Sequence, residues 1–181
     1  MIRLATQHDA AGIARVHVET WRDTYAGIIP DHALLAMDVR REAARQRHAL
    51  GLRRGDGLTF VAEQPRLGIV GYAEAGRARP AGFGFEAELY TLYVLPGHQG
   101  EGHGRSLLGA VFARLVRLGY RSAIVWVLAE NPARFFYNAM GAARVAHRTE
   151  RLFGADLAQE AFGWADLEGA LQPTGRLIRR S

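Results

Sequence analysis

The sequence predicts an α/β fold: a mixed sheet with helices on both faces, in one domain that spans residues 1–181. Short segments rich in β-branched and aromatic residues alternate with amphipathic segments whose apolar residues recur at helical spacing. No long linker, low-complexity tract or internal repeat divides the chain. The length of 181 residues suits one domain with a substantial core.

The N-terminal part is expected to hold one short strand followed by helices. Ile2–Ala5 is strand-like, and Asp9 opens an amphipathic segment that runs to Gly27. Pro30 and the aspartate after it are typical of a new helix start. An arginine-rich helix over Val39–Leu50 is expected to follow.

Strand-forming residues take over near residue 58. Leu58–Glu63 and Gly68–Ala75 predict a hairpin, since a proline and a glycine separate them. Gly76–Gly84, with several glycines, is expected to be a loop. Glu86–Leu95 is expected to be the third strand of this series, and Pro96 ends it.

The C-terminal half alternates helices and strands. An amphipathic helix is expected to run from the loop near residue 104 to Gly119, and a second one from Asn131-Pro132 to Gly141. Three further strands are expected over Ser122–Ala129, Ala142–Leu152 and Ala158–Ala165.

Composition excludes several classes of function. No apolar run is long enough to cross a bilayer and the N-terminus lacks a hydrophobic signal region, so we expect a cytoplasmic protein without a membrane partner. Cysteine is absent, which excludes disulfides and thiolate nucleophiles. The net charge of +5 comes from arginine alone, without a basic face interleaved with aromatic residues, so we expect no nucleic-acid partner.

The segment Gln99–Gly104 (QGEGHG) lies between a strand and an amphipathic helix. The free N–H groups at a helix start and the helix dipole favour an anion at this place. Gly102 and Gly104 allow close approach of the backbone, and Arg105 adds positive charge. The segment therefore predicts an anion-binding loop, while a ligand-free tight turn remains open from the loop alone.

Other glycine-rich motifs fit less well. The dinucleotide-binding fingerprint needs a third glycine where this chain has Leu107, and the phosphate loop of NTPases needs a lysine, which the chain lacks. A serine-hydrolase elbow would need a glycine at Leu108.

Two motifs in order resemble the GNAT superfamily of N-acetyltransferases. The first is Gln99-x-x-Gly102-x-Gly104 after a strand that ends Leu92-Tyr93-Val94-x-Pro96. The second is Asn131-Pro132-Ala133-Arg134-x-x-Tyr137-x-x-Met140-Gly141. The start of the chain, including Trp21-x-x-x-Tyr25-x-Gly27-Ile28-Ile29-Pro30, is similar to that of many bacterial members. His103 stands where an aliphatic residue is usual, and Ala142 where an aromatic residue is usual.

The resemblance implies a GNAT-type, mostly antiparallel central sheet of about seven strands, and acetyl-CoA as cosubstrate without a metal. Backbone amides of the loop would hold the pyrophosphate, and the strand before it the pantetheine arm. The amide of Val94 would polarise the thioester carbonyl. The cofactor-binding residues that this assigns are Leu92, Tyr93, Val94, Gln99, Gly100, Glu101, Gly102, His103, Gly104, Arg105, Ser106 and Asn131.

The resemblance also implies direct transfer to a primary amine. Tyr137 would protonate the departing thiolate, and Glu88 would be the base, acting directly or through a water, with Glu86 as the alternative. Glu19, Trp21 and Tyr25 are candidates for the amine pocket or for helix packing, and Phe135 and Phe136 are expected in the core. A small-molecule amine is the expected acceptor and a peptide N-terminus the alternative, with a non-catalytic acyl-CoA-binding module as a third reading. Dimers are common in the family, so a homodimer remains open.

Overall fold

A computed structural model describes residues 1–52, 57–80 and 83–171. Its strands form one seven-stranded sheet in the order β1-β2-β3-β4-β5-β7-β6. Only the β4–β5 pair is parallel, so the expected mixed, mostly antiparallel sheet is confirmed. The strands are β1 (Ile2–Leu4), β2 (Leu58–Gln64), β3 (Gly68–Arg77), β4 (Ala87–Val94), β5 (Ala123–Leu128), β6 (Ala143–Leu152) and β7 (Ala155–Trp164).

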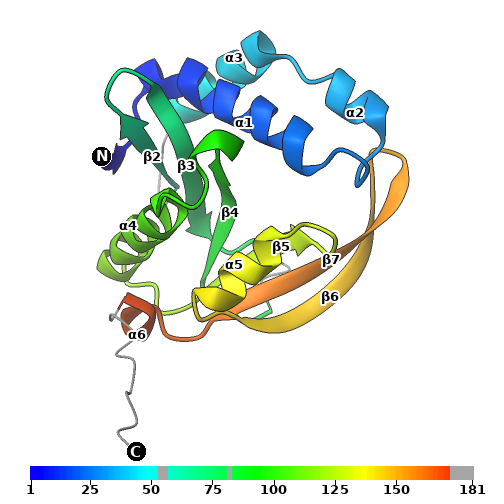
Figure 1. Cartoon of the computed structure of the whole chain (residues 1–181). Coiled ribbons are helices and arrows are strands. Elements are labelled where there is room, and N and C mark those ends of the chain that lie inside the picture. Colours follow the sequence, from blue (N-terminus) through cyan, green and yellow to red (C-terminus); the bar gives the residue numbers. More distant parts are fainter. Residues whose placement is uncertain (53–56, 81–82, 172–181) are drawn as a thin grey trace, which may run out of the picture.

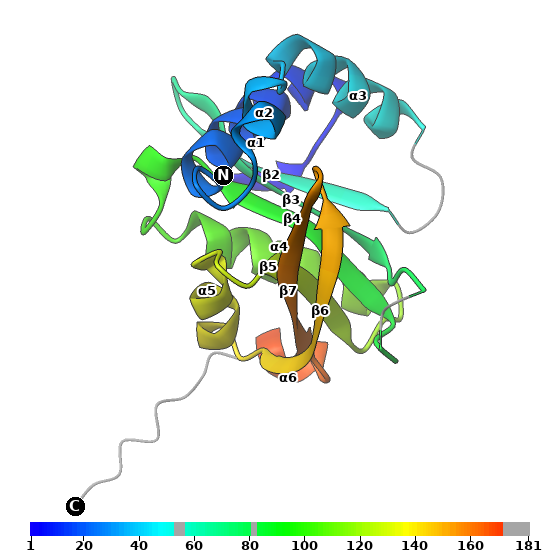
Figure 2. The same ribbon diagram turned by 90° about the vertical axis from the view of Figure 1, so that its right-hand side faces the viewer.

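Helices cover both faces of the sheet, as expected (Figure 1). On one face lie α1 (Ala10–Thr24), α2 (Asp31–Leu35) and α3 (Val39–Gly51). On the other lie α4 (His103–Arg117), α5 (Ala133–Ala139) and α6 (Leu167–Leu171). Figure 2 shows α1, α2 and α3 above the sheet and α4, α5 and α6 in the lower part of the view. Within the described residues, no helix is long and apolar enough to span a membrane.

The core follows from the periodicities of these elements. The inward stripe of α4 is fully buried at Leu107, Leu108, Val111, Phe112 and Leu115, which confirms the helix predicted after the glycine loop. Apolar residues at helical spacing on one stripe, packed against alternate residues of the strands, remove this surface from water on both faces.

Two strand boundaries differ from the predictions by two residues or more, and one helix was missed. β3 continues to Arg77, because its last residues pair with Ala87 and Glu88 of β4. β7 begins at Ala155 and not at residue 158, because a two-residue turn joins it to β6. Phe153 and Gly154 form that turn with φ of 54° and 82°, and a phenylalanine in the left-handed region gives no recognisable turn signal. α6 was not predicted.

The parallel strands β4 and β5, in the middle of the sheet, are paired over only part of their length and then diverge. β4 and β5 are in register only from Ala87 to Leu89 on β4 and from Ala123 to Val125 on β5. Tyr90 has no partner on β3, since the register shifts between Leu89 and Thr91. Such a bulge bends the strand, and the rest of β4 diverges from β5.

Candidate active site

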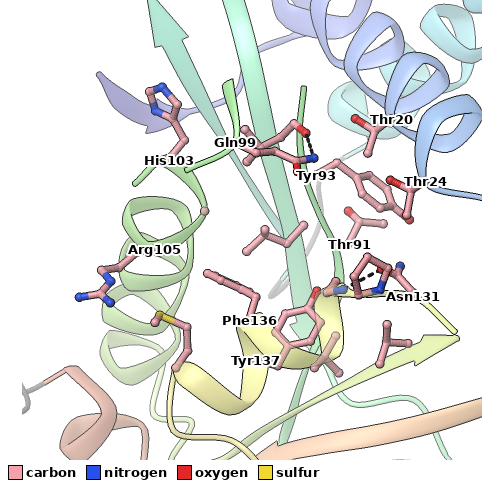
Figure 3. A pocket seen from close by; sticks show the side chains of 18 of the residues that line it. Thr20, Thr24, Thr91, Tyr93, Gln99, His103, Arg105, Asn131, Phe136 and Tyr137 are labelled. Carbon is pink, nitrogen blue, oxygen red and sulfur yellow. Dashed lines mark hydrogen bonds between the residues drawn. The ribbon is translucent and has the colours of Figure 1, made fainter. Parts of the chain in front are cut away.

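A cavity of about 660 Å³ fills the opening between the diverging strands. Residues from both faces of the sheet line it, so it passes from the α4–α5 side to the side of α1 (Figure 3). Of the residues predicted from sequence, those that line it are Leu92, Tyr93, Val94, Gln99, Gly100, Gly102, His103, Gly104, Arg105, Asn131 and Tyr137. Glu88, Glu101 and Ser106 do not line it.

The glycine loop, Gln99–Gly104, forms the end of this cavity next to the start of α4. Gly100 and Gly102 have φ of 79° and 82°, a conformation that costs other residues energy. Gly102 is also the N-cap of α4, so the first amides of the helix follow it directly. The amide of Ser106, by contrast, already donates to the Gly102 carbonyl at 3.0 Å. The free amides therefore belong to the residues before Ser106.

Side chains of the loop form a small polar cluster. Glu101 accepts a hydrogen bond from Gln64 of β2 at 2.8 Å, and its carboxylate lies 3.1 Å from His103 Nε2. Partial desolvation raises the pKa of Glu101, but its contacts with Gln64, His103 and His98 together lower the pKa. The cluster fixes the loop against β2. Within the described part of the chain, no group of three or more metal-ligating side chains could hold a metal ion.

The backbone of β4 presents free polar groups to the cavity. The amide of Leu95 donates to Val70 of β3, while the carbonyl of Val94 accepts from Gln99 Nε2 at 3.2 Å. Because successive residues of a strand point their N–H and C=O groups to opposite edges, the amides of Val94 and Leu92 face the opening and not β3. This free edge is what an amide-containing chain would pair with.

Asn131 lies at the start of α5 and is buried. Its Oδ1 accepts a hydrogen bond from the Ala133 amide at 2.8 Å, which caps the helix as its sequence predicted. Its Nδ2 donates to the hydroxyl of Tyr25 at 3.0 Å. One hydrogen of Nδ2 remains for another acceptor.

Tyr137 lies on the inner side of α5, and only 4% of its surface is exposed. Burial raises its pKa well above the usual value, so the hydroxyl keeps its proton at neutral pH. Figure 3 shows this hydroxyl directed away from α5, toward the cavity. The next residue back, Phe136, also lines the cavity. Phe135 was expected in the core, but 64% of its surface is exposed, because the short helix turns only one face inward.

Glu88 is buried outside the cavity, and only 2% of its side chain is exposed. Its carboxylate accepts hydrogen bonds from the backbone amide of Arg79 at 3.1 Å and from the Arg79 guanidinium. Glu86, the alternative base, accepts from the amide of Arg121 at 2.6 Å and also lies outside the cavity.

The α1 side of the cavity carries hydroxyl groups that sequence reasoning missed. Tyr25 lines the cavity, whereas Glu19 and Trp21 do not. Unpredicted lining residues include Thr20, Thr24, Tyr90, Thr91, Trp126, Phe136 and Met140. The hydroxyls of Thr20 and Thr91 are buried without a hydrogen-bond partner among the described residues. Thr20 and Thr24 lie one helical turn apart on α1. This spacing was the only feature of the sequence that could have placed both hydroxyls on one face of the helix.

Comparison with known proteins agrees with this architecture. Residues 13–142 match the acetyltransferase (GNAT) family. The uncharacterized N-acetyltransferase YuaI of Bacillus subtilis (strain 168) is 34% identical over 168 residues, which cover 92% of this chain and 93% of that protein.

Solved structures share the fold. That of yncA, a putative acetyltransferase from Salmonella typhimurium with its cofactor acetyl-CoA, has a TM-score of 0.67 at 24% identity and covers 92% of this chain and 93% of its own. A ribosomal-protein-alanine N-acetyltransferase from Brucella melitensis has a TM-score of 0.66 at 24% identity, with 91% and 98% covered.

Proposed function

Because the chain belongs to the acetyltransferase (GNAT) family and is an N-acetyltransferase, we propose that it moves the acetyl group of acetyl-CoA directly to a primary amine of a small molecule. The observation that carries this proposal is the opening between β4 and β5, which leads from the glycine loop to Tyr137. We further propose that the enzyme works in the cytoplasm.

The residues around the opening fit the cofactor. A side chain at Gly104 would point its Cβ between Phe136 and Leu92, at 3.4 and 3.7 Å, so the glycine leaves space inside the cavity wall. In our proposal the amides between Gln99 and Arg105 hold the pyrophosphate at the start of α4. The free edge of β4 pairs with the amides of the pantetheine arm, and the spare hydrogen of Asn131 Nδ2 adds a donor.

Acetyl-CoA supplies an acetyl group activated as a thioester. In the proposed reaction the amine nitrogen forms a bond to the carbonyl carbon while the carbon–sulfur bond breaks. The amide of Val94 stabilises the negative charge that develops on the carbonyl oxygen. Tyr137 gives its proton to the departing sulfur. These roles need a neutral tyrosine, which the raised pKa provides.

Glu88 remains the proposed base, acting through a water. Its place on β4, two residues before the cavity-lining Tyr90, supports a short path to the amine. Its contacts with Arg79 oppose this role, since the backbone amide and the guanidinium of Arg79 already occupy both carboxylate oxygens. The proposal therefore requires that the substrate or the water weakens those contacts.

The acceptor side supports a polar amine. The hydroxyls of Thr20 and Thr91, which have no hydrogen-bond partner in the described part of the chain, belong to residues of the cavity wall, and a buried hydroxyl without a partner is costly. A ligand with its own hydrogen-bonding groups would satisfy them.

The test is release of free thiol from acetyl-CoA against a panel of small amines and of peptides with free N-termini. Tyr137→Phe serves as the control for background hydrolysis. The proposal is supported if the unaltered protein acetylates small amines and the Tyr137→Phe variant does not. Turnover of peptides alone would favour a protein N-terminal acetyltransferase, and acetyl-CoA binding without any turnover a non-catalytic acyl-CoA-binding module.

A further inference from the structure

The two strands that enclose the cavity need a support other than each other. Beyond Leu89 and Val125 they share no ladder of hydrogen bonds. An opening of fixed width nevertheless requires that β4 and the segment after β5 keep a fixed separation. In this region β4 is paired only with β3 and β5 only with β7 among the described strands, so a direct link between the two sides has to come from side chains.

Tyr25 is in a position to join them. It follows the last residue of α1, and only 7% of its surface is exposed. Its own backbone is fixed, because its amide donates to the Trp21 carbonyl at 3.0 Å and its carbonyl accepts from the Ile28 and Ile29 amides at 3.0 and 3.1 Å. The ring packs edge-on against Trp21, with the centroids 4.9 Å apart. The side chain therefore projects from a rigid anchor on α1.

Tyr25 lies between the two sides of the opening. On the α5 side it accepts the 3.0 Å hydrogen bond from Asn131 Nδ2, across 106 residues of sequence. On the β4 side, Tyr25 shares the cavity wall with Tyr93, and the helix that it follows, α1, packs on β4. Burial raises the pKa of both tyrosines, so both hydroxyls stay neutral.

We infer that Tyr25 is a positioning residue whose hydroxyl ties the start of α5 to the end of α1, the helix that packs on β4, and so sets the width of the cofactor cavity. Nothing in the family match assigns this role, and its relevance to catalysis rests on the proposed function. The link acts through Asn131, whose Oδ1 caps α5 at the Ala133 amide. A fixed cap in turn fixes the first turn of the helix that carries Tyr137.

The first test needs no ligand. Tyr25→Phe keeps the ring and removes the hydroxyl, which leaves Asn131 Nδ2 without its acceptor. We expect the Ala133 amide to exchange with deuterium about 10-fold faster in this variant, because its acceptor is no longer held. Exchange within twofold of the unaltered protein would overturn the inference.

Tyr72→Phe is the matched control. Tyr72 is fully buried and its hydroxyl lies 2.7 Å from His17 Nδ1, but it does not line the cavity. This control loses a comparable buried hydrogen bond, so it should reproduce any general loss of thermal stability and leave the Ala133 amide protected. Equal exposure of that amide in both variants would mean that Tyr25 has only a general stabilising role, against the inference.

The second test measures the consequence for the cofactor by calorimetry with acetyl-CoA. Tyr25→Phe should raise the Kd about 10-fold and Asn131→Ala by more, since Asn131→Ala also removes a proposed donor to the cofactor, and the double variant should bind no more weakly than Asn131→Ala alone, because the link is already lost there. Independent, multiplicative effects would contradict the link.

Two further outcomes are separable. If Tyr25→Phe does not fold, Asn131→Ser decides, because its shorter side chain keeps an acceptor for the Ala133 amide and loses the hydrogen bond to Tyr25. That amide should then exchange about 10-fold faster, and exchange within twofold of the unaltered protein would overturn the inference. If the unaltered protein binds no acetyl-CoA, the proposed function fails while the exchange experiment still decides the role of Tyr25.

Discussion

Gly104 offers the sharpest test of the cofactor loop, because the structure separates its effect on folding from its effect on binding. The residue lies in the first turn of α4 with an ordinary helical backbone, unlike Gly100 and Gly102, whose φ is positive. A Cβ at Gly104 would meet the nearest Phe136 carbon at 3.4 Å, an ordinary van der Waals contact. Gly104→Ala should therefore fold without strain and gain up to about 1 kcal/mol from helix propensity.

Binding should change in the opposite direction. The added methyl group projects into space that we assign to the cofactor, and overfilling a packed site costs about 1–3 kcal/mol. This corresponds to a Kd for acetyl-CoA raised by roughly 5- to 150-fold for Gly104→Ala, and Gly104→Val should abolish measurable binding. Calorimetry with acetyl-CoA and a thermal unfolding curve on the same samples measure both effects.

A matched control lies on the same helix. No atom lies within 4 Å of a Cβ built at Gly109, and this residue does not line the cavity. Gly109→Ala should gain helix stability and leave the affinity for acetyl-CoA unchanged. Normal affinity in Gly104→Val would refute the assignment of the loop.

Three other predictions concern two proposed catalytic residues and the stability of the fold. Tyr137→Phe should lower kcat by about 10²- to 10⁴-fold with little change in the Kd for acetyl-CoA, and unchanged turnover would remove Tyr137 from the mechanism. Glu88→Gln should lower kcat by about 10²-fold while Arg79→Ala, which frees the carboxylate, keeps it; an equal loss in both variants would make the pair purely structural. Contacts with Arg3 lower the pKa of Asp9 from 3.8 to about 2, so this pair stabilises the fold above pH 4 and loses its effect as the pH falls toward 2. Asp9→Asn should therefore cost about 2 kcal/mol at pH 7 and almost nothing at pH 2 in urea unfolding, and a cost independent of pH would contradict this.

Features encoded within a few neighbouring residues could be predicted from the sequence. The stripe on α4, the loop before it and the cap at Asn131 each depend on residues within one or two helical turns. Periodicity and turn chemistry report such local features directly. The cavity-lining role of Leu92, Gly104 and Tyr137 followed from the same segments.

Features that depend on distant contacts could not be predicted. Tyr25 bonds to Asn131 across 106 residues, and the sequence offered no reason to connect them. The ion pair of Glu88 with Arg79 depends on how the segment after β3 lies against β4. Nothing in the sequence indicated this partner, so the Glu88 carboxylate was expected to be available as a base. The bulge at Tyr90 arises from register with β3 and has no local signature.

The same division separates the donor side of the site from the acceptor side. The side that we assign to the donor is built from one strand edge, the loop after it and one short helix, each of them continuous in sequence. The side that we assign to the acceptor is assembled from the end of α1, with Thr20, Thr24 and Tyr25, and from the bulged part of β4, with Tyr90 and Thr91. A substitution at any of these residues can move the acceptor wall and leave the glycine loop unchanged. Proteins with the same loop are therefore expected to share the acyl donor more readily than the amine. For this reason the hydroxyls of Thr20 and Thr91, and not the loop, are the residues to vary first when the acceptor is sought.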